Sequence, residues 1–468
     1  GTWAAKPTAW AMLGRTGLLA FLLPALASAL LLDRFRLTPD PGTVASPDFN
    51  FFGGCSRTSK CTRFSLDWNQ PVEIHPTNNG NFTIYFNGST GLEPVFSTPV
   101  RSPFVWVNYA TVNLDISADL FQRDGEYSIS LSDASFVASA MDESFSTGIS
   151  ASEWSFQVLA SGAPKYNSSI PTPTYSTDIA QLISQMQAAN VAATIQKLAS
   201  HYNRFFQSQS GLDSHVWLKQ QYDALVQPNK LGENPTVSSF PHRWLMPSLI
   251  ARIPADPSSP LADEVIILGA HLDSINRQNW TVNVKAGEAP GADDNASGVA
   301  LQLEMFRLLT AAKYAGTRTI EFHAYAAEEE GLYGSLDVAA SYTRQGVKVA
   351  AMLQLDQCAY VRDPANPVVA LFTDHTDPLL TSLVRDVLGL YVSSTTVITS
   401  DEAGRADSDF HSWHIHGFRA AYLAEGPVDD IVYGNSKHTA YDRFETIDMD
   451  HAMRIGAASL AYLLHMSS

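Results

Sequence analysis

Val265-Ile266-Ile267-Leu268-Gly269-Ala270 is the stretch that decides the fold, because it is apolar without interruption. A strand of this kind suits a sheet that is covered on both faces, since neither of its sides can meet water. Outward from it, periodicity predicts a helix over 299–309, a strand over 319–326, a helix over 336–344 and a strand over 349–355. This alternation predicts an α/β domain of three layers, with a mixed sheet that is parallel at its centre.

Polar residues follow this strand immediately. His271 ends the apolar run, and Asp273 stands two residues later. Residues i and i+2 of an extended chain point to the same side, so the carboxylate can lie beside the imidazole. We expect Asp273 to accept the ring N–H that does not face a metal, which would fix the tautomer of His271.

The loop 291–298 reads Gly-Ala-Asp-Asp-Asn-Ala-Ser-Gly and precedes a helix. Its flanking glycines allow a tight backbone. Two adjacent carboxylates before a helix often only cap it or interact with its dipole. However, two metal ions roughly 3.5–4 Å apart need a bridging carboxylate, and this loop can present one.

Acidic residues also follow the next two predicted strands. Glu328-Glu329-Glu330 lies at the carboxyl end of a core strand, where the sites of α/β proteins form. Adjacent carboxylates point in different directions, so one can bind a metal while its neighbour acts as a base. Asp356 ends the following strand, where an Asp would be costly without a metal or hydrogen bonds. His438 follows a Gly/Asn-rich loop, a natural place for a late ligand.

These segments together supply two histidines and several carboxylates without a cysteine. Zn²⁺ accepts such ligands, and a two-metal hydrolytic site requires them. The chain from about residue 177 onward resembles the bacterial leucyl aminopeptidase family of two-zinc exopeptidases. The resemblance rests on His-Leu-Asp-Ser at 271–274, the loop at 291–298, Ala-Tyr-Ala-Ala-Glu-Glu at 324–329, Leu-Gln-Leu-Asp at 353–356, Ser-Asp at 408–409 and His-Thr at 438–439.

The resemblance implies two Zn²⁺ ions and a role for each matching residue. Asp294 would bridge the ions, Glu328 would be the general base, and Asp273 would support His271. The remaining ligands would be His271 and Asp356 on one ion and Glu329 and His438 on the other. Members of the family carry a Cys-x-x-x-Cys disulfide around a tyrosine, where this sequence has Ala403, Arg405 and Asp407.

The resemblance implies an aminopeptidase that acts on the N-termini of peptides or proteins, and the N-terminal segment described below predicts that it is secreted. One alternative is a glutaminyl-cyclase-like transferase, which uses one zinc; His271, a ligand for a second metal, argues against it. A second alternative is a receptor-like ectodomain that has lost its metals, which the complete ligand set argues against.

The rest of the chain predicts further domains. Residues 1–29 contain a basic segment, an apolar stretch and small residues, which indicate a cleaved signal peptide or a signal anchor. A linker is expected over 30–51. Residues 52–160 alternate apolar and polar residues at period two, which predicts an all-β, immunoglobulin-like sandwich. A Pro-rich linker at 161–176 would lead to the peptidase domain at 177–468.

Net charge, cysteines and glycosylation motifs limit which partners and which surroundings we expect for this chain. The formal net charge of −17 argues against nucleic acid as the main partner, and membrane contact is expected only if the N-terminal apolar segment stays as an anchor. Cys55 and Cys61 are close enough for a disulfide, whereas Cys358 lies in an apolar strand pattern and is expected to be buried. Asn-x-Ser/Thr sequons favour a secreted glycoprotein, but the one at Asn295 lies in the metal loop and is expected to stay unused.

Overall fold

A computed structural model describes the chain in two compact units, one running up to Ser161 and the other from Gly162 to Ser468. In the C-terminal unit it describes Tyr166 and residues 168–277, 287–400, 408–433 and 436–468; in the N-terminal unit it describes the strands and Gly80. The predicted signal segment, Cys55 and Asn279 lie outside the described residues. No helix among the described residues is long and apolar enough to cross a membrane.

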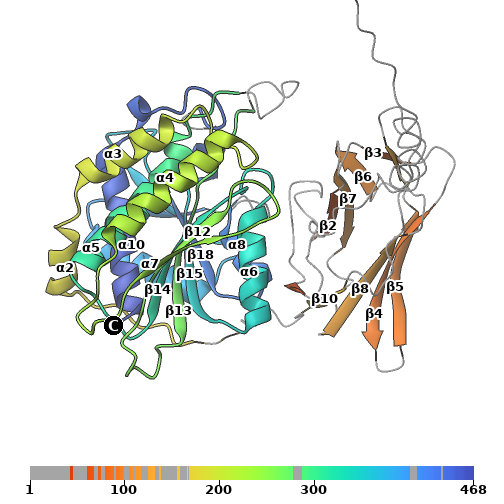
Figure 1. Ribbon diagram of the computed structural model, residues 1–468, viewed down its shortest axis with the longest axis horizontal. Helices are drawn as coiled ribbons and strands as arrows, with labels where there is room; N and C mark the ends of the chain where they lie inside the picture. Colours follow the sequence, from red (N-terminus) through yellow and green to blue (C-terminus); the bar gives the residue numbers. More distant parts are fainter. Residues whose placement is uncertain are drawn as a thin grey trace, which may run out of the picture. The chain divides into compact units, whose positions relative to one another are not determined.

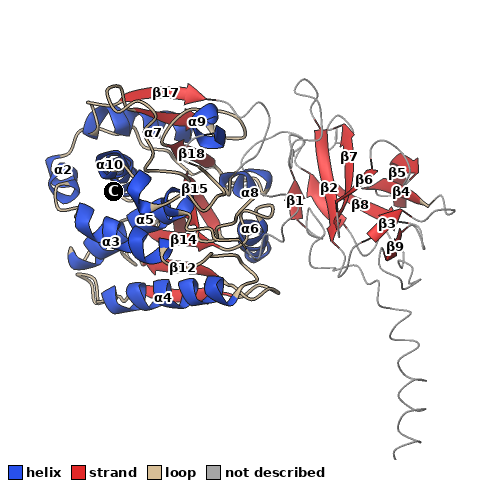
Figure 2. Ribbon diagram, turned by 90° about the horizontal axis from the view of Figure 1, so that it is seen from above, coloured by secondary structure: helices blue, strands red, loops and turns tan. Residues whose placement is uncertain are grey.

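The C-terminal unit is built on one eight-stranded sheet of order β11-β12-β14-β13-β15-β18-β16-β17 (Figures 1 and 2). Strands β14, β13, β15 and β18 are mutually parallel, whereas β12 joins β14, and β16 joins β18, in antiparallel fashion. The predicted mixed sheet with a parallel centre is therefore confirmed. The strands are β11 (Thr236–Phe240), β12 (Ser248–Ile253), β13 (Glu264–His271), β14 (Thr319–Tyr325), β15 (Lys348–Leu355), β16 (Val368–Phe372), β17 (Thr396–Ser400) and β18 (Ala420–Ala424).

The apolar run that decides the fold lies in β13, between β14 and β15. Every residue of β13 is buried. Its side chains alternate between two separate cores. Ile266 and Leu268 pack into one core, and Val265 and Ile267 pack into the other. A continuous apolar run is what such a position requires, since both faces of the strand are covered.

Helices cover the two faces unequally (Figures 1 and 2). The larger core receives side chains from α2, α3, α4, α5, α7 and α10, and the smaller core receives them from α6 and α8. The bounds are α2 (Thr177–Ile183), α3 (Ala188–Ala199), α4 (Gln209–Leu225), α5 (Gly298–Ala311), α6 (Tyr333–Gln345), α7 (Pro378–Tyr391), α8 (Phe410–Ile415), α9 (Val428–Tyr433) and α10 (Met449–Met466). The three predicted layers are thus helices, sheet and helices.

Local sequence sets several helix ends. Asp377 caps α7 by accepting the N–H of Leu380 at 2.9 Å, and Asp448 caps α10 by accepting that of His451 at 2.9 Å. Helix α6 ends at Gly346, whose φ of 65° lies in the left-handed region that glycine adopts without strain.

The described part of the N-terminal unit consists of strands. One sheet has the order β1-β10-β8-β4-β5, a second β2-β7-β6, and a third contains β3 and β9. Phe82, Ile84, Ile129 and Leu131 from β4 and β8 are buried, as the period-two pattern requires. The immunoglobulin-like assignment stays a prediction. The bounds are β1 (Thr43–Ala45), β2 (Cys61–Asp67), β3 (Val72–Ile74), β4 (Asn81–Gly88), β5 (Gly91–Pro99), β6 (Val105–Asn108), β7 (Thr111–Ser117), β8 (Gly125–Leu131), β9 (Phe136–Ala138) and β10 (Ser155–Val158).

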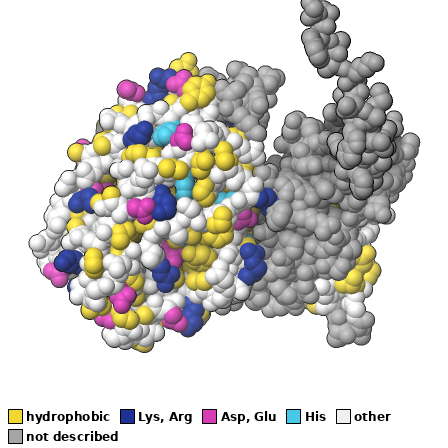
Figure 3. All heavy atoms as spheres, in the orientation of Figure 1, with side chains coloured by type: hydrophobic (Ala, Val, Ile, Leu, Met, Phe, Trp, Pro, Cys, Tyr) yellow, Lys and Arg dark blue, Asp and Glu magenta, His cyan; other side chains and the backbone are white. Residues whose placement is uncertain are grey.

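Charge on the C-terminal unit is mixed. On the face in Figure 3, acidic and basic side chains are interspersed among the described residues rather than gathered by sign. The acidic excess of the sequence therefore does not form one broad field on this face.

Residues 168–176, the strap, belong to the predicted linker but are held on the C-terminal unit. Ser168 donates to Glu264 at 2.5 Å, and Arg318 donates to the same carboxylate at 2.6 Å. Tyr166, just before the strap, donates to Glu264 at 2.8 Å. At the other end the ring of Tyr175 stacks on Tyr391, with 5.5 Å between centroids.

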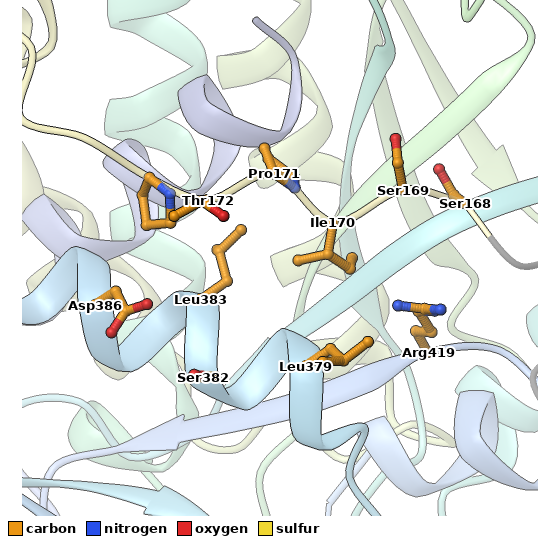
Figure 4. Close-up of a pocket in the computed structure, with 11 residues that line it drawn as sticks. Ser168, Ser169, Ile170, Pro171, Thr172, Leu379, Ser382, Leu383, Asp386 and Arg419 are labelled. Atoms are coloured by element: carbon orange, nitrogen blue, oxygen red, sulfur yellow. The ribbon is translucent and has the colours of Figure 1, made fainter.

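A cavity of about 360 Å³ lies between the strap and α7, with Arg419 at one end and Asp386 at the other (Figure 4). Its lining among the described residues contains none of the predicted site residues.

Candidate metal centre

The predicted site residues meet at the carboxyl ends of the central strands. His271 is the last residue of β13, Asp356 follows β15, and Glu328 and Glu329 lie in the loop after β14. Asp294 comes from a helical turn at Ala292–Ser297 that leads into α5, and the loop after α9 supplies His438. Parallel strands place their carboxyl ends at one edge of a sheet, so ligands that are distant in sequence converge there.

Two groups of side chains share one carboxylate. His271 Nε2 lies 3.0 Å from Asp294 Oδ1 and 3.3 Å from Asp356 Oδ1. His438 Nε2 lies 3.2 Å from Asp294 Oδ2 and 2.7 Å from Glu329 Oε2. The two oxygens of Asp294 therefore face different groups, which is the arrangement that a bridging carboxylate requires.

The donor atoms fit divalent metal ions. Within each group the possible ligand atoms lie within 4.8 Å of one another. Asp294 Oδ2, Glu329 Oε1 and His438 Nε2 are buried yet make no hydrogen bond of acceptable geometry to any described residue. Buried polar atoms normally have a partner, and metal ions would satisfy these. Imidazole and carboxylate donors without a thiolate suit Zn²⁺.

Burial and neighbouring charges shift the pKa values at this centre. Burial alone would lower the pKa of His271, but the carboxylates of Asp356 and Glu328 outweigh it and raise the pKa. Burial raises the pKa of Glu328 well above its usual value, and the charges of Glu329 and Asp356 add to the effect. The centre therefore brings several carboxyl groups together where they are buried.

Asp273 supports this centre differently from our expectation. His271 Nδ1 faces the backbone carbonyl oxygen of Asp273 at 3.1 Å, whereas the Asp273 carboxylate is 3.7 Å away. The expected carboxylate–imidazole hydrogen bond is therefore not formed in this structure, although the carboxylate lies within ion-pair distance of the ring. The carboxylate instead accepts the N–H of Glu328 at 3.0 Å and that of Glu329 at 3.2 Å.

The glycines that flank the metal loop are required by close contacts. Gly291 has a φ of 52°, and a Cβ atom there would lie 2.4 Å from the carbonyl oxygen of Asp294. A Cβ on Gly298 would lie 2.6 Å from Asn295 Oδ1. Asn295 is fully buried and donates to the carbonyl of Leu355 at 2.8 Å, which agrees with its sequon being unused.

The sequence predicted no role for Arg204, which lies next to the loop 291–298. Its side chain is fully buried. The guanidinium donates to the carbonyls of Leu272 at 2.7 Å and Gly291 at 2.8 Å, and also to that of Pro290. Burial lowers the pKa of Arg204 to about 10, so it stays charged at neutral pH. Arg204 thus ties the segment after His271 to the segment before Asp294.

Two other residues form hydrogen bonds with a proposed ligand or with the backbone that carries one. Ser408 donates to Asp356 Oδ2 at 2.6 Å. The carboxylate of Asp442 accepts the backbone N–H groups of Asp293 at 2.9 Å and Asp294 at 3.0 Å. Ser408 belongs to the Ser-Asp block of the family resemblance, but no signal in the sequence pointed to Asp442.

The sequence predicted no role for Lys437 either. It precedes His438, and its Nζ lies 3.7 Å from Asp294 Oδ2. Cys358, in contrast, is a buried free thiol as expected.

Comparisons with known proteins agree with the site. The sequence model described as Peptidase family M28 matches residues 248–463. "Leucine aminopeptidase 1" of Pyrenophora tritici-repentis is 34% identical over 298 residues, which cover 62% of this chain and 73% of that protein. This relative is fungal, so the predicted resemblance to bacterial members in particular was too narrow.

Solved structures share the fold. The LapA aminopeptidase of Legionella pneumophila matches with a TM-score of 0.55 and 25% identity, over 64% of this chain and 78% of that one. A glutaminyl cyclase of Fimbriiglobus ruber matches with a TM-score of 0.50 and 16% identity, over 64% of this chain and 100% of that one. At that identity the second match concerns the fold alone.

Proposed function

We propose that this chain, which belongs to peptidase family M28, is a metal-dependent aminopeptidase that removes N-terminal residues from peptides. The observation that carries the proposal is the pair of ligand groups that share Asp294. A relative that is 34% identical is named a leucine aminopeptidase, which supports the same activity.

We infer that the centre holds two Zn²⁺ ions. His271 and Asp356 would hold one, Glu329 and His438 the other, and Asp294 would bridge them. When bound, the ions supply Lewis acidity towards the scissile carbonyl and the attacking water.

The proposed general base is Glu328. It is buried at the centre, and its Oε2 lies 4.0 Å from His271 Nε2, so it can reach a water held between the ligand groups. Glu328 would take the proton of that water and pass it to the leaving amine. Both steps require a group that accepts and then releases a proton, which a carboxylate at this position can do.

The carboxylates at the centre would also bind the free α-amine of the substrate, which favours cleavage at the N-terminus. The N-terminal apolar segment supports secretion as part of the proposal, with peptides or protein N-termini as substrates.

A glutaminyl-cyclase-like reaction is the second candidate, because a glutaminyl cyclase shares the fold. A cyclase that uses one zinc has no need of two ligand groups with a shared carboxylate. The arrangement around Asp294 therefore favours the peptidase.

One experiment separates the candidates. The full chain is loaded with Zn²⁺, its metal content is measured, and it is assayed on an aminoacyl anilide and on a peptide with N-terminal glutamine. Two ions per chain with release of the anilide supports the aminopeptidase. One ion with cyclisation of the glutamine supports the cyclase, and neither activity with no bound metal supports a receptor-like ectodomain.

A further inference from the structure

A serine, a histidine and an aspartate are hydrogen-bonded in series beside residues 326–332, the base loop, which carries Glu328. Ser248 Oγ lies 2.8 Å from His242 Nε2, and His242 Nδ1 lies 2.8 Å from Asp337 Oδ2. A carboxylate can only accept a hydrogen bond, so Nδ1 carries the proton, and Nε2 of the neutral ring accepts the hydroxyl of Ser248. The proposed reaction gives none of these three side chains a role.

The series does not supply a serine nucleophile. Ser248 is fully buried, and the side chain of His242 has no exposed surface. The Ser248 oxygen also accepts the backbone N–H of Ala326 at 3.0 Å. A nucleophile must reach the reacting atom of a substrate, whereas this hydroxyl bonds to the protein on both sides. The role of Ser248 therefore lies in the backbone that it holds.

That backbone is the start of the base loop. Ala327 and Leu332, near the two ends of the loop, have φ values of 59° and 61°, a region that residues with side chains rarely adopt. Such conformations persist only where the surrounding structure holds them. Ser248 holds the loop at Ala326, two residues before Glu328. The conformation that presents the proposed base therefore depends on this hydrogen bond.

The same series also reaches the far end of the base loop. Asp337 lies in the second turn of α6, the helix that follows the loop directly. Gly334, in the first turn, packs so closely on Ala326 that a Cβ atom would overlap the carbonyl oxygen of Ala326. His242 thus connects the residue that holds the start of the loop to the helix at its end. Because the loop is held at both ends, loss of one of these bonds should displace Glu328.

We propose that Ser248 is a positioning residue for the general base, with His242 and Asp337 directing its hydroxyl so that the oxygen lone pairs face Ala326. This inference rests on the proposed function, because it takes Glu328 as the base. A base must lie within hydrogen-bond reach of the proton that it takes. A misplacement of about 1 Å can cost roughly 10²-fold in rate.

Ser248→Ala tests the proposal, since it removes the acceptor of the Ala326 N–H. With the zinc-loaded full chain on an aminoacyl anilide, we expect kcat to fall by roughly 10–100-fold and KM to change by about twofold or less. Ser459→Ala is the matched control. It removes another fully buried hydroxyl of the C-terminal unit, which donates to the carbonyl of Ile455 at 2.8 Å in α10. Equal kcat in the two variants would overturn the proposal.

A double variant shows whether Ser248 acts through Glu328. In the Glu328→Gln background, Ser248→Ala should change kcat by about twofold or less, because the contribution of the base is already lost. A serine that only stabilises the fold would lower kcat by the same factor in both backgrounds, and that result contradicts positioning. Near-parental kcat in Glu328→Gln alone would remove the assigned base, and this proposal with it.

Hydrogen exchange adds a measurement that needs neither zinc nor turnover. In the metal-free full chain, the amides of the base loop should exchange about tenfold faster or more in Ser248→Ala than in the parent, while those of α10 stay unchanged. Unchanged exchange in the loop would refute the proposal. Faster exchange in a chain without peptidase activity would contradict the proposed function but not the attachment of the loop to Ser248.

Asp337→Ala provides a second variant in case Ser248→Ala does not fold. Asp337 is the outer end of the series, and 24% of its side chain is exposed. Its loss leaves the His242 ring without the acceptor that orients it, so we expect a several-fold loss of kcat in the parent and none in Glu328→Gln. A folded, zinc-loaded Asp337→Ala with parental kcat and parental exchange in the base loop would overturn the proposal.

Discussion

Asp273 holds the backbone of Glu328: its Oδ1 accepts the Glu328 N–H at 3.0 Å, while its Oδ2 accepts that of Glu329 at 3.2 Å. One buried carboxylate therefore positions the proposed base and a proposed ligand together. Asp273→Asn replaces one acceptor oxygen by an NH₂ group that cannot accept, so one N–H loses its partner. We expect a roughly 10–100-fold loss of kcat/KM. Asp377→Asn, at the cap of α7, is the control, and equal activity in both variants would argue against this role.

Glu328→Gln tests the base. The amide preserves the shape of the side chain but cannot take a proton from water, so we expect kcat to fall by roughly 10²–10⁴-fold while metal content stays the same. Glu330→Gln changes the same charge two residues away and should have a much smaller effect. Near-parental kcat in Glu328→Gln at full metal occupancy would assign the base elsewhere.

Removal of single ligands tests the shared carboxylate. Asp294→Ala removes a ligand from both groups, so both ions should bind more weakly or be lost. His438→Ala removes a ligand from one group and should weaken the binding of only one ion. Metal analysis after dialysis at a series of free zinc concentrations distinguishes the two patterns. Loss of one ion in each variant would rule out Asp294 as the bridge.

Arg204→Met tests the hydrogen bonds from Arg204 to the backbone beside His271 and before Asp294. The variant leaves the carbonyls of Leu272, Pro290 and Gly291 without their donor, and we expect unfolding in denaturant to become easier by about 3 kcal/mol or more. Zinc affinity should fall as well, because these carbonyls flank His271 and Asp294. Lys219→Met, which removes an exposed pair with Asp223, should cost about 1 kcal/mol or less. Equal stability of the two variants would contradict the prediction.

Truncation tests the strap. A chain that begins at Gly162 keeps Tyr166 and Ser168 on Glu264, and we expect its kcat on a small anilide to match the full chain. A chain that begins at Thr177 loses these partners and should unfold more easily, by roughly 1–3 kcal/mol. If the chain from Gly162 is folded and zinc-loaded but inactive, the N-terminal unit contributes to the site.

The sequence predicts the C-terminal fold well because its strongest signals are local. The run at 265–270 is buried on both faces in β13, and the helix and strand patterns that follow it correspond to α5, β14, α6 and β15. The strap was less predictable. Its prolines suggest a linker, whereas its attachment depends on Glu264 and Arg318, which are distant in sequence.

The candidate site was likewise predictable only where its signals are local in sequence. Ligand types at strand ends indicate a metal centre, since strand order brings those ends together. The partner of each ligand depends on how the chain turns beyond the strand. That is why the Asp273 carboxylate accepts backbone N–H groups rather than the ring N–H of His271, and why no role was predicted for Arg204 or Lys437.

The candidate ligands come from five segments spread along the C-terminal unit, and none of the segments can hold an ion alone. The centre is complete only when β13, β14 and β15 are paired and the loop of His438, more than 80 residues beyond Asp356 in the chain, has docked. Such non-local contacts form late and slowly in folding. Zinc should then bind the native state but not its precursors, adding about 4 kcal/mol at a thousandfold excess over Kd. The melting temperature of this chain should consequently depend on the free zinc of its surroundings.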